Sequence, residues 1–318
     1  MSGKVPTAFA DGAPTRDGYG AGLVKAGKKN AKVVALDADL AESTRSKWFG
    51  DLFPDRFFQM GIAEQDMVTT AAGLASAGLV PFASTFAIFT ERAFEQVRNA
   101  VARPNLNVKI VGSHGGLMTG EDGSSAHAIE DVAIYRALPN MTIVVPGDAT
   151  ECMKATEALA EHAGPAYLKL TRAKVPKLFD DAYDFRLGRA ATLRDGSDIT
   201  IVANGALLGE AVAAADLLKK ENVSVRVLGM ATVKPLDGDA LLAAAKETGR
   251  IVTAEDHSVI GGLGSAVCEF LSEHRPTPVK RVGVRDLYAV SGTPKELYEK
   301  YQLSAPHLAG VVREALKG

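Results

Sequence analysis

The stretch that decides the expected fold is GIAEQDMVTTAAGLASAGLVPFASTFAIFTE, residues 61–91. It places Glu64 at the start of a predicted helix and supplies two aromatic rings, Phe86 and Phe89, three positions apart. The helix consists mostly of small residues, and each glycine costs about 1 kcal/mol of helix propensity relative to alanine. Close approach of another backbone would offset that cost, so we expect a subunit interface along this helix. A carboxyl group beside an aromatic platform indicates a receptor for a flat, nitrogenous ring.

Strand and helix patterns alternate on both sides of this stretch. Short apolar runs predict strands at residues 32–40, 108–114, 141–146 and 166–170, and helical patterns are found at residues 15–29, 64–77, 91–102 and 149–162. Alternation of this kind is typical of a doubly wound, mostly parallel sheet. Ligand-binding residues often lie where such strands end.

A second series of strands and helices follows residues 172–196, which have little periodicity and which we interpret as a linker. Its expected strands are residues 198–205, 223–230, 250–257 and 279–284, and its expected helices are residues 207–220 and 264–273. The predicted fold class is therefore α/β with two domains, each a mostly parallel sheet flanked by helices. We place a first domain at residues 1–175, the linker at 176–195 and a second domain at 196–318.

Composition describes an ordinary globular chain of 318 residues, with 47% hydrophobic and 23% charged residues. That length exceeds a usual single domain, which favours two. A net charge of −2 without a run of lysine and arginine argues against a nucleic-acid or anionic-membrane partner. The first residues lack the apolar core of a signal peptide, and no segment has about eighteen uninterrupted apolar residues, so we expect a cytoplasmic protein. Cys152 and Cys268 lie far apart in helical patterns, which predicts buried thiols and no disulfide.

The GIAEQ motif at residues 61–65, the small-residue helix and STFAIF at residues 84–89 together resemble the pyrimidine-binding domain of thiamine diphosphate enzymes. Motifs further along make transketolase the family that the sequence resembles most, over nearly the whole chain. The resemblance implies that the Glu64 carboxyl group hydrogen-bonds a ring nitrogen of the cofactor's aminopyrimidine. By sharing a proton with that ring, Glu64 would let the opposite amino group deprotonate the thiazolium carbon. The ordinary alternative is a first-turn carboxylate that interacts with the helix dipole, worth about 0.3–1 kcal/mol.

The same resemblance assigns the aromatic pair to the cofactor ring. It implies that Phe86 and Phe89 line the aminopyrimidine pocket and that Phe89 stacks on the ring, which would add about 0.5–1.5 kcal/mol beyond burial. Without the preceding motif, two phenylalanines at this spacing would be interpreted as core residues. Arg92 lies where the family usually has a tyrosine, and we expect its side chain at the same pocket.

Two further parts of the chain resemble the sugar-phosphate contacts of transketolases. ADLAES at residues 38–43 resembles the family's A-D-L-x-x-S, which implies that Asp39 lies near the cofactor and Ser43 near the substrate phosphate. Arg16 in TRDGYGAGL and Arg172 in LTRAKVP match family arginines that bind sugar phosphate. Arginine suits this task because its planar guanidinium can bond two phosphate oxygens at once. The structural alternatives are a strand-ending aspartate and surface salt bridges.

Residues 112–131, GSHGGLMTGEDGSSAHAIED, carry the second strong motif. The resemblance implies that His114 contacts the substrate phosphate and that Asp122 contacts the C2 hydroxyl of the donor sugar. The glycines let a loop turn tightly next to a ligand. The family usually reads G-E-D-G-x-x-H-Q, whereas this chain has Ala126 at the histidine position and His127 at the glutamine position. Either the loop shifts by one residue, so that His127 takes the catalytic role, or that role is vacant.

One motif of thiamine diphosphate enzymes is missing from the chain. These enzymes hold the diphosphate through Mg²⁺ on a G-D-G motif followed about thirty residues later by asparagine, because Mg²⁺ prefers oxygen ligands that bridge to phosphates. The only comparable cluster, PLDGDA at residues 235–240, leads to no such asparagine. We therefore predict that this chain supplies no metal ligand. The expected cofactors are thiamine diphosphate and Mg²⁺, with the Mg²⁺ ligands on a partner subunit. An N-terminal transketolase subunit would carry the diphosphate and Mg²⁺ domain, with two copies of each subunit as the simplest closed assembly.

The segment TAEDHSVIGGLG, residues 253–264, resembles the turn of transketolase C-terminal domains. Its G-G-x-G pattern lacks the rest of a nucleotide-binding fingerprint and is a weak indicator of phosphate binding. We interpret it as a packing turn before a helix and assign no catalytic residue to it.

The function that the resemblance implies is a subunit of a thiamine diphosphate-dependent transketolase, which moves a two-carbon ketol unit between sugar phosphates. A β subunit of a 2-oxoacid dehydrogenase decarboxylase component shares the glutamate and the two-domain plan but needs no phosphate-binding arginines. A deoxyxylulose-phosphate synthase-like enzyme shares the sugar-phosphate chemistry but is usually one unbroken chain. The non-enzyme alternative is a silent stabilising subunit, against which the retained Glu64 and Asp122 argue.

Overall fold

Within residues 5–9 and 12–317, which the computed structural model describes, seven strands form the larger of two sheets. Their order is β10-β5-β6-β4-β3-β1-β2, and every neighbouring pair is parallel except β10 with β5. The strands are β1 (Val33–Asp37), β2 (Phe57–Gln59), β3 (Val80–Phe86), β4 (Lys109–Ser113), β5 (Thr142–Val144), β6 (Ala166–Lys169) and β10 (Thr232–Lys234). The predicted mostly parallel sheet is confirmed.

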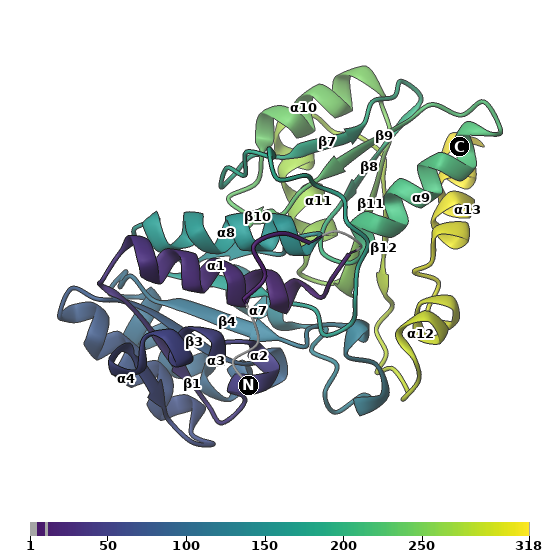
Figure 1. The fold of residues 1–318 in the computed structure, drawn as a ribbon. Helices are drawn as coiled ribbons and strands as arrows, with labels where there is room; N and C mark the ends of the chain where they lie inside the picture. The colour runs from purple at the N-terminus through teal and green to yellow at the C-terminus, as the bar shows by residue number, and fades with distance from the viewer. Residues whose placement is uncertain (1–4, 10–11, 318) are drawn as a thin grey trace.

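Helices cover both faces of this sheet and flank the second one (Figure 1). The longer helices are α1 (Thr15–Lys29), α4 (Glu64–Ser76), α8 (Ala149–Glu161), α9 (Leu207–Lys219), α10 (Gly238–Glu247), α11 (Leu263–His274) and α13 (Ala305–Lys317). The shorter ones are α2 (Ala41–Thr44), α3 (Lys47–Leu52), α5 (Ala87–Thr90), α6 (Phe94–Gln96), α7 (Asp131–Arg136), α12 (Pro294–Lys300), and the segments η1 (Pro54–Arg56), η2 (Glu91–Ala93), η3 (Val97–Ala102) and η4 (Leu117–Asp122). Helices α1, α4, α8, α9 and α11 match their predicted ranges to within one residue at each end.

The two faces of the first sheet are set by the alternation of side chains along each strand. In β1, Val33 and Ala35 belong to the core cluster shared with α1 and α8, whereas Val34 and Leu36 belong to the cluster shared with α4. Helices α1 and α8 lie side by side over their face (Figure 1). Gly22 permits this approach, since a Cβ atom there would lie 2.5 Å from the carbonyl oxygen of Met153.

The second sheet has the order β12-β11-β8-β9-β7 and is parallel except for the pair of β7 with β9. Its strands are β7 (Ala191–Arg194), β8 (Ile199–Ala203), β9 (Val225–Gly229), β11 (Ile251–Ser258) and β12 (Val279–Val284). Helix α9 packs its apolar face on this sheet, with Leu207, Ala211, Ala215 and Leu218 all buried. The predicted two-domain α/β architecture is confirmed.

The two sheets exchange more chain than the sequence indicated. Strand β7 lies inside residues 176–195, the expected linker, and pairs antiparallel with β9. Strand β10 follows β9 along the chain yet pairs with β5 of the first sheet. The division into residues 1–175 and 196–318 therefore stays a prediction. The pairing of β10 with β5 crosses that division.

Residues 91–102 depart from the single helix predicted for them. The backbone there passes through the 3₁₀ turn η2, the short α6 and the π-helical η3. Two carbonyls in this region accept hydrogen bonds from distant side chains, since Tyr135 Oη donates to Thr90 at 2.8 Å and Gln65 Nε2 donates to Arg92 at 3.1 Å. Tertiary contacts thus compete with the regular helical ladder.

The cysteines are both free. Cys152 is buried in α8, but Cys268 in α11 is partly exposed, so the prediction of a buried thiol is wrong for Cys268. The buried face of α11 runs through Leu263, Val267 and Leu271, and Cys268 lies beside it. Among the described residues, no helix combines the length and the apolar character needed to cross a membrane.

Candidate active site

The carboxyl ends of neighbouring parallel strands bring the predicted site residues to one edge of the first sheet. Asp39 follows β1, Phe86 ends β3, His114 follows β4 and Arg172 follows β6. These strands are adjacent in the order β6-β4-β3-β1. Because parallel strands end at the same edge, residues distant in sequence become neighbours there.

Glu64 is the first residue of α4 and is only 5% exposed. Its Oε2 lies 3.7 Å from Nη1 of Arg92. The same guanidinium stands over the Phe89 ring, 4.9 Å from the ring centroid. The structure therefore brings the carboxylate, the aromatic ring and the arginine together.

Phe86 and Phe89 lie nearly parallel, with ring centroids 5.7 Å apart and an angle of 8° between the planes. Phe86 also stacks on the His114 imidazole, with ring centroids 3.8 Å apart. Both phenylalanines are only partly buried. Their rings are therefore accessible to a planar ligand rather than fully packed in the core.

His114 lies directly after β4 in the left-handed region, with φ of 59°. Its Nδ1 is 2.9 Å from Ser113 Oγ, and its Nε2 is 3.4 Å from Nη1 of Arg16. Burial lowers the pKa of His114 to about 3, helped by the positive charges of Arg16, Arg172 and Arg45. The imidazole is therefore neutral at neutral pH and can donate one hydrogen bond and accept another.

Arg16 connects α1 to the short helix α2 that follows β1. Its Nη1 donates to the carbonyl oxygen of Ser43 at 3.1 Å, and burial lowers the pKa of the guanidinium. Its Nε is buried without a partner among the described residues. This cation keeps hydrogen-bonding capacity for an anionic ligand.

Arg172 organises the loop that carries Asp122. Its Nη1 donates to the Thr119 carbonyl at 2.8 Å, lies 3.0 Å from Asp122 Oδ1, and lies 3.6 Å from Glu121 Oε2. The side chains of Arg172 and Asp122 are 37% and 40% exposed, respectively. Both partners of this ion pair can therefore also meet a ligand.

His127 lies in the same loop but faces its interior. It is 3% exposed, and its Nε2 hydrogen-bonds the Gly120 carbonyl at 2.9 Å. Its Nδ1 is buried without a partner in the described part of the chain. Ala126, at the family's histidine position, is partly exposed. A catalytic role for His127 stays a prediction.

Asp39 and Ser43 line one hollow of about 530 Å³ next to the strand edge. Asp39 is exposed and has φ of 63°, whereas Ser43 lies within the short helix α2. Among the described residues, no hydrogen bond joins the Asp39 side chain to the other predicted site residues. The structure thus places Asp39 near the other predicted site residues but not in direct hydrogen-bond contact with those that it describes.

Asp37, at the end of β1, is a supporting residue that the sequence analysis missed. It is fully buried and accepts hydrogen bonds from the Leu40 amide and from the hydroxyls of Thr44 and Ser46. Burial raises its pKa to about 6, and the three donors partly offset that rise. Asp37 thereby shapes the turn that carries Asp39. Its position at a strand end was the available signal.

Asp256 is the second residue that the sequence analysis left without a role. The turn TAEDHSVIGGLG does lie before α11, as predicted, but the Asp256 carboxylate reaches the loop between His114 and Asp122. The signal was an acidic pair at the end of a strand, which we interpreted as packing alone.

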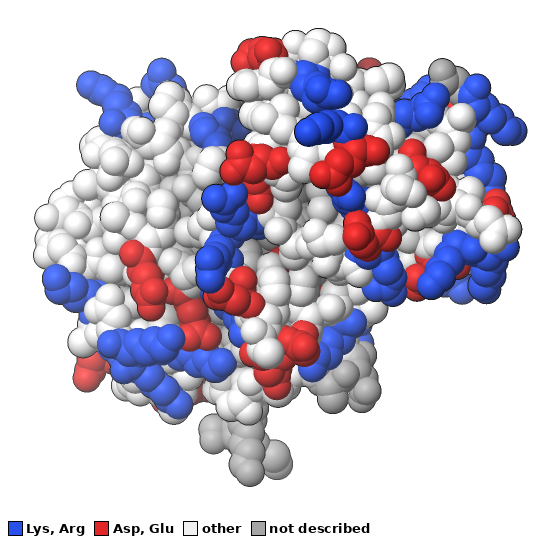
Figure 2. Space-filling model, turned by 90° about the horizontal axis from the view of Figure 1, so that it is seen from above, with Lys and Arg blue, Asp and Glu red and all other residues white. Residues whose placement is uncertain are grey.

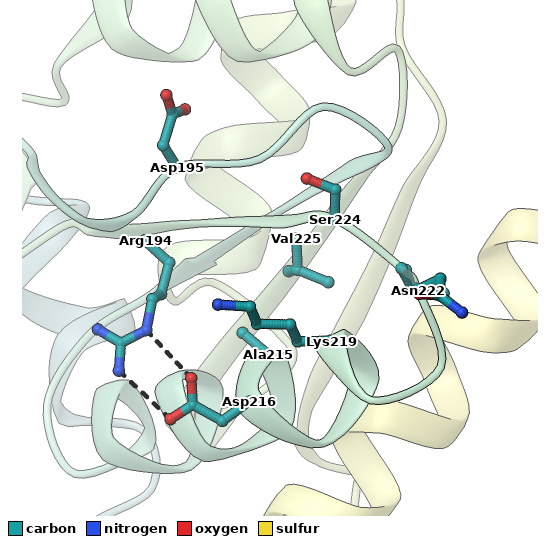
Figure 3. Close-up of a pocket in the computed structure, with 9 residues that line it drawn as sticks. Arg194, Asp195, Ala215, Asp216, Lys219, Asn222, Ser224 and Val225 are labelled. Atoms are coloured by element: carbon teal, nitrogen blue, oxygen red, sulfur yellow. Dashed lines mark hydrogen bonds and ion pairs between the residues drawn. The ribbon is translucent and has the colours of Figure 1, made fainter.

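Another hollow, of about 420 Å³, lies on the second domain between the end of β7, helix α9 and the start of β9 (Figure 3). An ion pair between Arg194 Nε and Asp216 Oδ1 at 3.1 Å crosses it. None of its lining residues is a predicted site residue. On the face shown in Figure 2, acidic and basic side chains are interspersed. The described residues contain no group of three or more His, Cys, Asp or Glu that could hold a metal ion.

A buried glutamate and a partly exposed aromatic pair near the carboxyl edge of a mostly parallel sheet fit the plan of a pyrimidine-binding module of thiamine diphosphate enzymes. The model of the transketolase pyrimidine binding domain matches residues 11–177, and that of the transketolase C-terminal domain matches residues 188–308. The chain belongs to the transketolase family.

Three of the similar proteins are described as transketolase subunits or as a split-gene transketolase. The chain is 40% identical to 6-deoxy-6-sulfo-D-fructose transketolase subunit SqwH of a Clostridium species, over 94% of this chain and 93% of that one. It is 38% identical to one subunit of the apulose-4-phosphate transketolase of Phocaeicola vulgatus, over 93% and 95% of the two chains. A solved split-gene transketolase, described as an inactive β4 tetramer, is 48% identical with a TM-score of 0.91, covering 96% of this chain and 99% of that one. These matches favour transketolase over the dehydrogenase and synthase alternatives.

Proposed function

We propose that this chain is the pyrimidine-binding and C-terminal subunit of a cytoplasmic, thiamine diphosphate-dependent transketolase, which moves a two-carbon ketol unit between sugar phosphates. The observation that carries the proposal is the cluster at the edge of the first sheet. It combines a buried glutamate, a partly exposed aromatic pair, a neutral histidine and two arginines. A silent stabilising subunit would need none of these groups at one edge.

The described residues fit the aminopyrimidine ring of thiamine diphosphate. Among them, the only ion pair of the buried Glu64 carboxylate is the 3.7 Å contact with Arg92, which leaves room for a ring nitrogen as a closer partner. The partly exposed Phe89 ring offers a stacking face. When bound, thiamine diphosphate supplies the thiazolium carbon that takes up the ketol unit.

The residues of this chain act around that ring. Glu64 would hold the proton that it shares with the ring nitrogen, and burial keeps water from competing for it. Phe89 would stack on the aminopyrimidine ring. Phe86, which lies parallel to Phe89, would help to line the same pocket. Arg92 now pairs with Glu64 and covers Phe89, so ring binding would draw its guanidinium away from both.

The sugar phosphate would bind on the His114 side of the cluster. Arg16 and Arg172 supply positive charge for the phosphate, and the neutral imidazole of His114 would contact the phosphate without adding charge. Asp122, partly exposed next to Arg172, would receive the C2 hydroxyl of the donor sugar. Ser43, which lines the same hollow as Asp39, would lie near the substrate phosphate.

A partner subunit would supply the diphosphate site and the ligands of Mg²⁺. The solved relative described as an inactive β4 tetramer supports a need for such a partner. Helix α4 supports a subunit seam, since a Cβ atom at Gly73 would meet nothing within 4 Å in this chain. Two copies of each subunit would close this assembly.

The test compares three samples under one assay of ketol transfer, each with Mg²⁺, thiamine diphosphate, a ketose phosphate and an aldose acceptor. They are the chain alone, its mixture with the N-terminal subunit, and the same mixture carrying Glu64→Gln. We expect no transfer by the chain alone and transfer by the mixture. Glu64→Gln should lower turnover by about 100-fold or more, because proton sharing is lost while size and shape are kept.

Thermal melting of Glu64→Gln is the control, and we expect it to match the unmodified chain. Turnover of the variant within a few fold of the unmodified mixture would rule out the assigned role of Glu64. Transfer by the lone chain at the rate of the mixture would rule out the two-subunit function.

A further inference from the structure

Asp256, near the end of β11, reaches from the second sheet to residues 115–123, which we call the substrate loop. Its Oδ1 accepts a hydrogen bond from the Leu117 amide at 2.8 Å, and its Oδ2 accepts one from the Met118 amide at 3.1 Å. Asp256 is only 7% exposed. One buried carboxylate of the second domain thus holds two successive backbone amides of the first.

The surroundings are shaped to hold this carboxylate in place. Gly116 has φ of 72°, and a Cβ atom there would lie 2.5 Å from Asp256 Oδ2, so a larger residue would push the loop away. Tyr298 Oη donates to Oδ2 at 3.1 Å. Lys169 Nζ donates to the Asp256 backbone carbonyl at 3.1 Å. The Asp256 carboxylate is therefore held from α12 as well as from the loop, and the Asp256 backbone is held from β6.

The held amides lie between two residues of the candidate site. Residues 117–118 separate His114 from Asp122 along the substrate loop. Next to them, Thr119 Oγ1 donates to the His114 carbonyl at 2.6 Å, and the Thr119 carbonyl accepts from Arg172 at 2.8 Å. Arg172 in turn pairs with Asp122 at 3.0 Å. A shift of the amides would pass through these bonds to both site residues.

Glu255, one residue earlier in β11, gives a matched contrast. It is also buried and also accepts hydrogen bonds from two successive backbone amides, those of Leu263 at 2.6 Å and Gly264 at 2.8 Å. These amides begin α11 of its own domain. Loss of Glu255 would therefore weaken the second domain without a direct effect on the substrate loop.

We propose that Asp256 is a positioning residue for ketol transfer, whose carboxylate fixes the substrate loop so that His114 and Asp122 meet the sugar in one geometry. The inference rests on the proposed function, because that function assigns the loop to sugar binding. It gives the C-terminal domain an effect on catalysis although none of its side chains would touch the substrate.

The experiment uses Asp256→Asn, which keeps the size but turns one acceptor oxygen into an NH₂ group that opposes an amide donor. In the assembled enzyme we expect kcat/KM for the ketose phosphate to fall about 10–100-fold, because small displacements of positioned groups cost up to that factor. The apparent affinity for thiamine diphosphate should stay within about twofold. In the lone chain, hydrogen exchange at residues 117–118 should accelerate about tenfold or more, since a protecting hydrogen bond is lost.

Glu255→Gln is the control, with kcat/KM within about threefold and unchanged exchange at residues 117–118, but with a lower melting temperature. Equal losses of kcat/KM in the two variants, or unchanged exchange or kinetics in Asp256→Asn, would overturn the proposal. Should Asp256→Asn fail to fold, Tyr298→Phe removes one hydrogen bond from the same carboxylate. It should lower kcat/KM about two- to tenfold, and wild-type kinetics there would overturn the proposal.

The exchange measurement needs no cofactor, partner or substrate. It therefore separates the two hypotheses. Absence of ketol transfer in the unmodified mixture would refute the proposed function, whereas unaltered loop exchange in Asp256→Asn would refute the positioning role.

Discussion

The substrate loop after β4 and the turn after β11 both combine an acidic side chain with several glycines, yet their carboxylates end in opposite surroundings. Asp122 in the loop is 40% exposed and meets Arg172 at 3.0 Å. Glu255 beside the turn is 2% exposed, and each of its oxygens accepts a hydrogen bond from an amide, that of Leu263 or that of Gly264. The first carboxylate is available to a ligand and the second is not.

The glycines also serve different ends in the two places. A Cβ atom at Gly262 would overlap the Glu255 carboxylate, so that glycine closes a turn over its own acid. In the loop, Gly116 makes room for Asp256, an acid from the other domain. Residue types alone do not separate a binding loop from a packing turn. The difference is whether the acid is buried against its donors or stays partly exposed.

The largest effect that tests this contrast is expected at Arg172. Arg172→Ala should raise the KM for phosphorylated sugars about 10- to 150-fold, because a charge-assisted hydrogen bond to phosphate is worth about 1.5–3 kcal/mol. The measurement compares sugar phosphates with their unphosphorylated analogues in the assembled enzyme. An equal loss on both would show that Arg172 only pairs with Asp122 and supports the loop.

The next effect concerns stability and should appear at the closed turn. Glu255→Gln keeps one acceptor oxygen but opposes its NH₂ group to an amide donor, which should cost about 1–3 kcal/mol of unfolding free energy. The melting temperature should fall by about 2–4 °C for each kcal/mol. Asp122→Asn is the matched control at the open loop, with lower turnover but a melting temperature within about 1 °C. A lower melting temperature in Asp122→Asn together with an unchanged one in Glu255→Gln would contradict the contrast between the two carboxylates.

The effect of Glu255→Gln on the melting temperature should also depend on pH. Burial raises the pKa of Glu255 to about 7 from 4.5, although its amide partners and Lys169 oppose the rise. Between these values the unfolded chain loses its proton first, so this group's contribution to the free energy of unfolding falls as pH rises. Glutamine has no proton to lose. The difference in melting temperature between wild type and variant should therefore shrink from pH 5 to pH 8, and a growing difference would contradict the raised pKa.

His257 also faces Glu255, with its Nδ1 3.8 Å from Oε2. Burial lowers the pKa of His257 to about 4, so its own contribution to stability is lost as pH falls below 6.5. Because this histidine is present in both proteins, its effect largely cancels in the difference between them.

The smallest effect is expected at the aromatic platform of the open edge. Phe89→Ala should weaken the apparent affinity for thiamine diphosphate about 2- to 12-fold, since it removes about 0.5–1.5 kcal/mol of stacking. The measurement is a cofactor titration against turnover. Phe94→Ala is the control, because Phe94 packs against Tyr135, with ring centroids 6.1 Å apart, and should change only stability. An unchanged cofactor affinity in Phe89→Ala would show that Phe89 contributes to packing and not to cofactor binding.

Much of the fold could be predicted from local patterns. Helices such as α1 and α9 were predicted almost to the residue, because their apolar spacing depends only on the chain itself. Residues 91–102 could not be predicted, because Tyr135 and Gln65 take carbonyls that a regular helix would use. Strands β7 and β10 were missed because each is three or four residues long and depends on a partner strand.

The candidate site divides in the same way. Motifs predicted Glu64, Phe89 and Arg92 as one pocket, and the structure brings them together. Asp37 and Asp256 were missed because a supporting carboxylate has no motif of its own. Their importance appears only in the backbone amides and hydroxyls that they hold.

The sequence by itself determined the alternation of strands and helices, the family and the identity of the side chains at the strand ends, because all of these depend on residue order. Only the tertiary structure decided that Asp256 holds Leu117, 139 positions away, and that burial among three arginines keeps His114 neutral. The physical reason is that hydrogen bonds and desolvation act through distances in space, which parallel strands and packed domains set and which residue order does not contain.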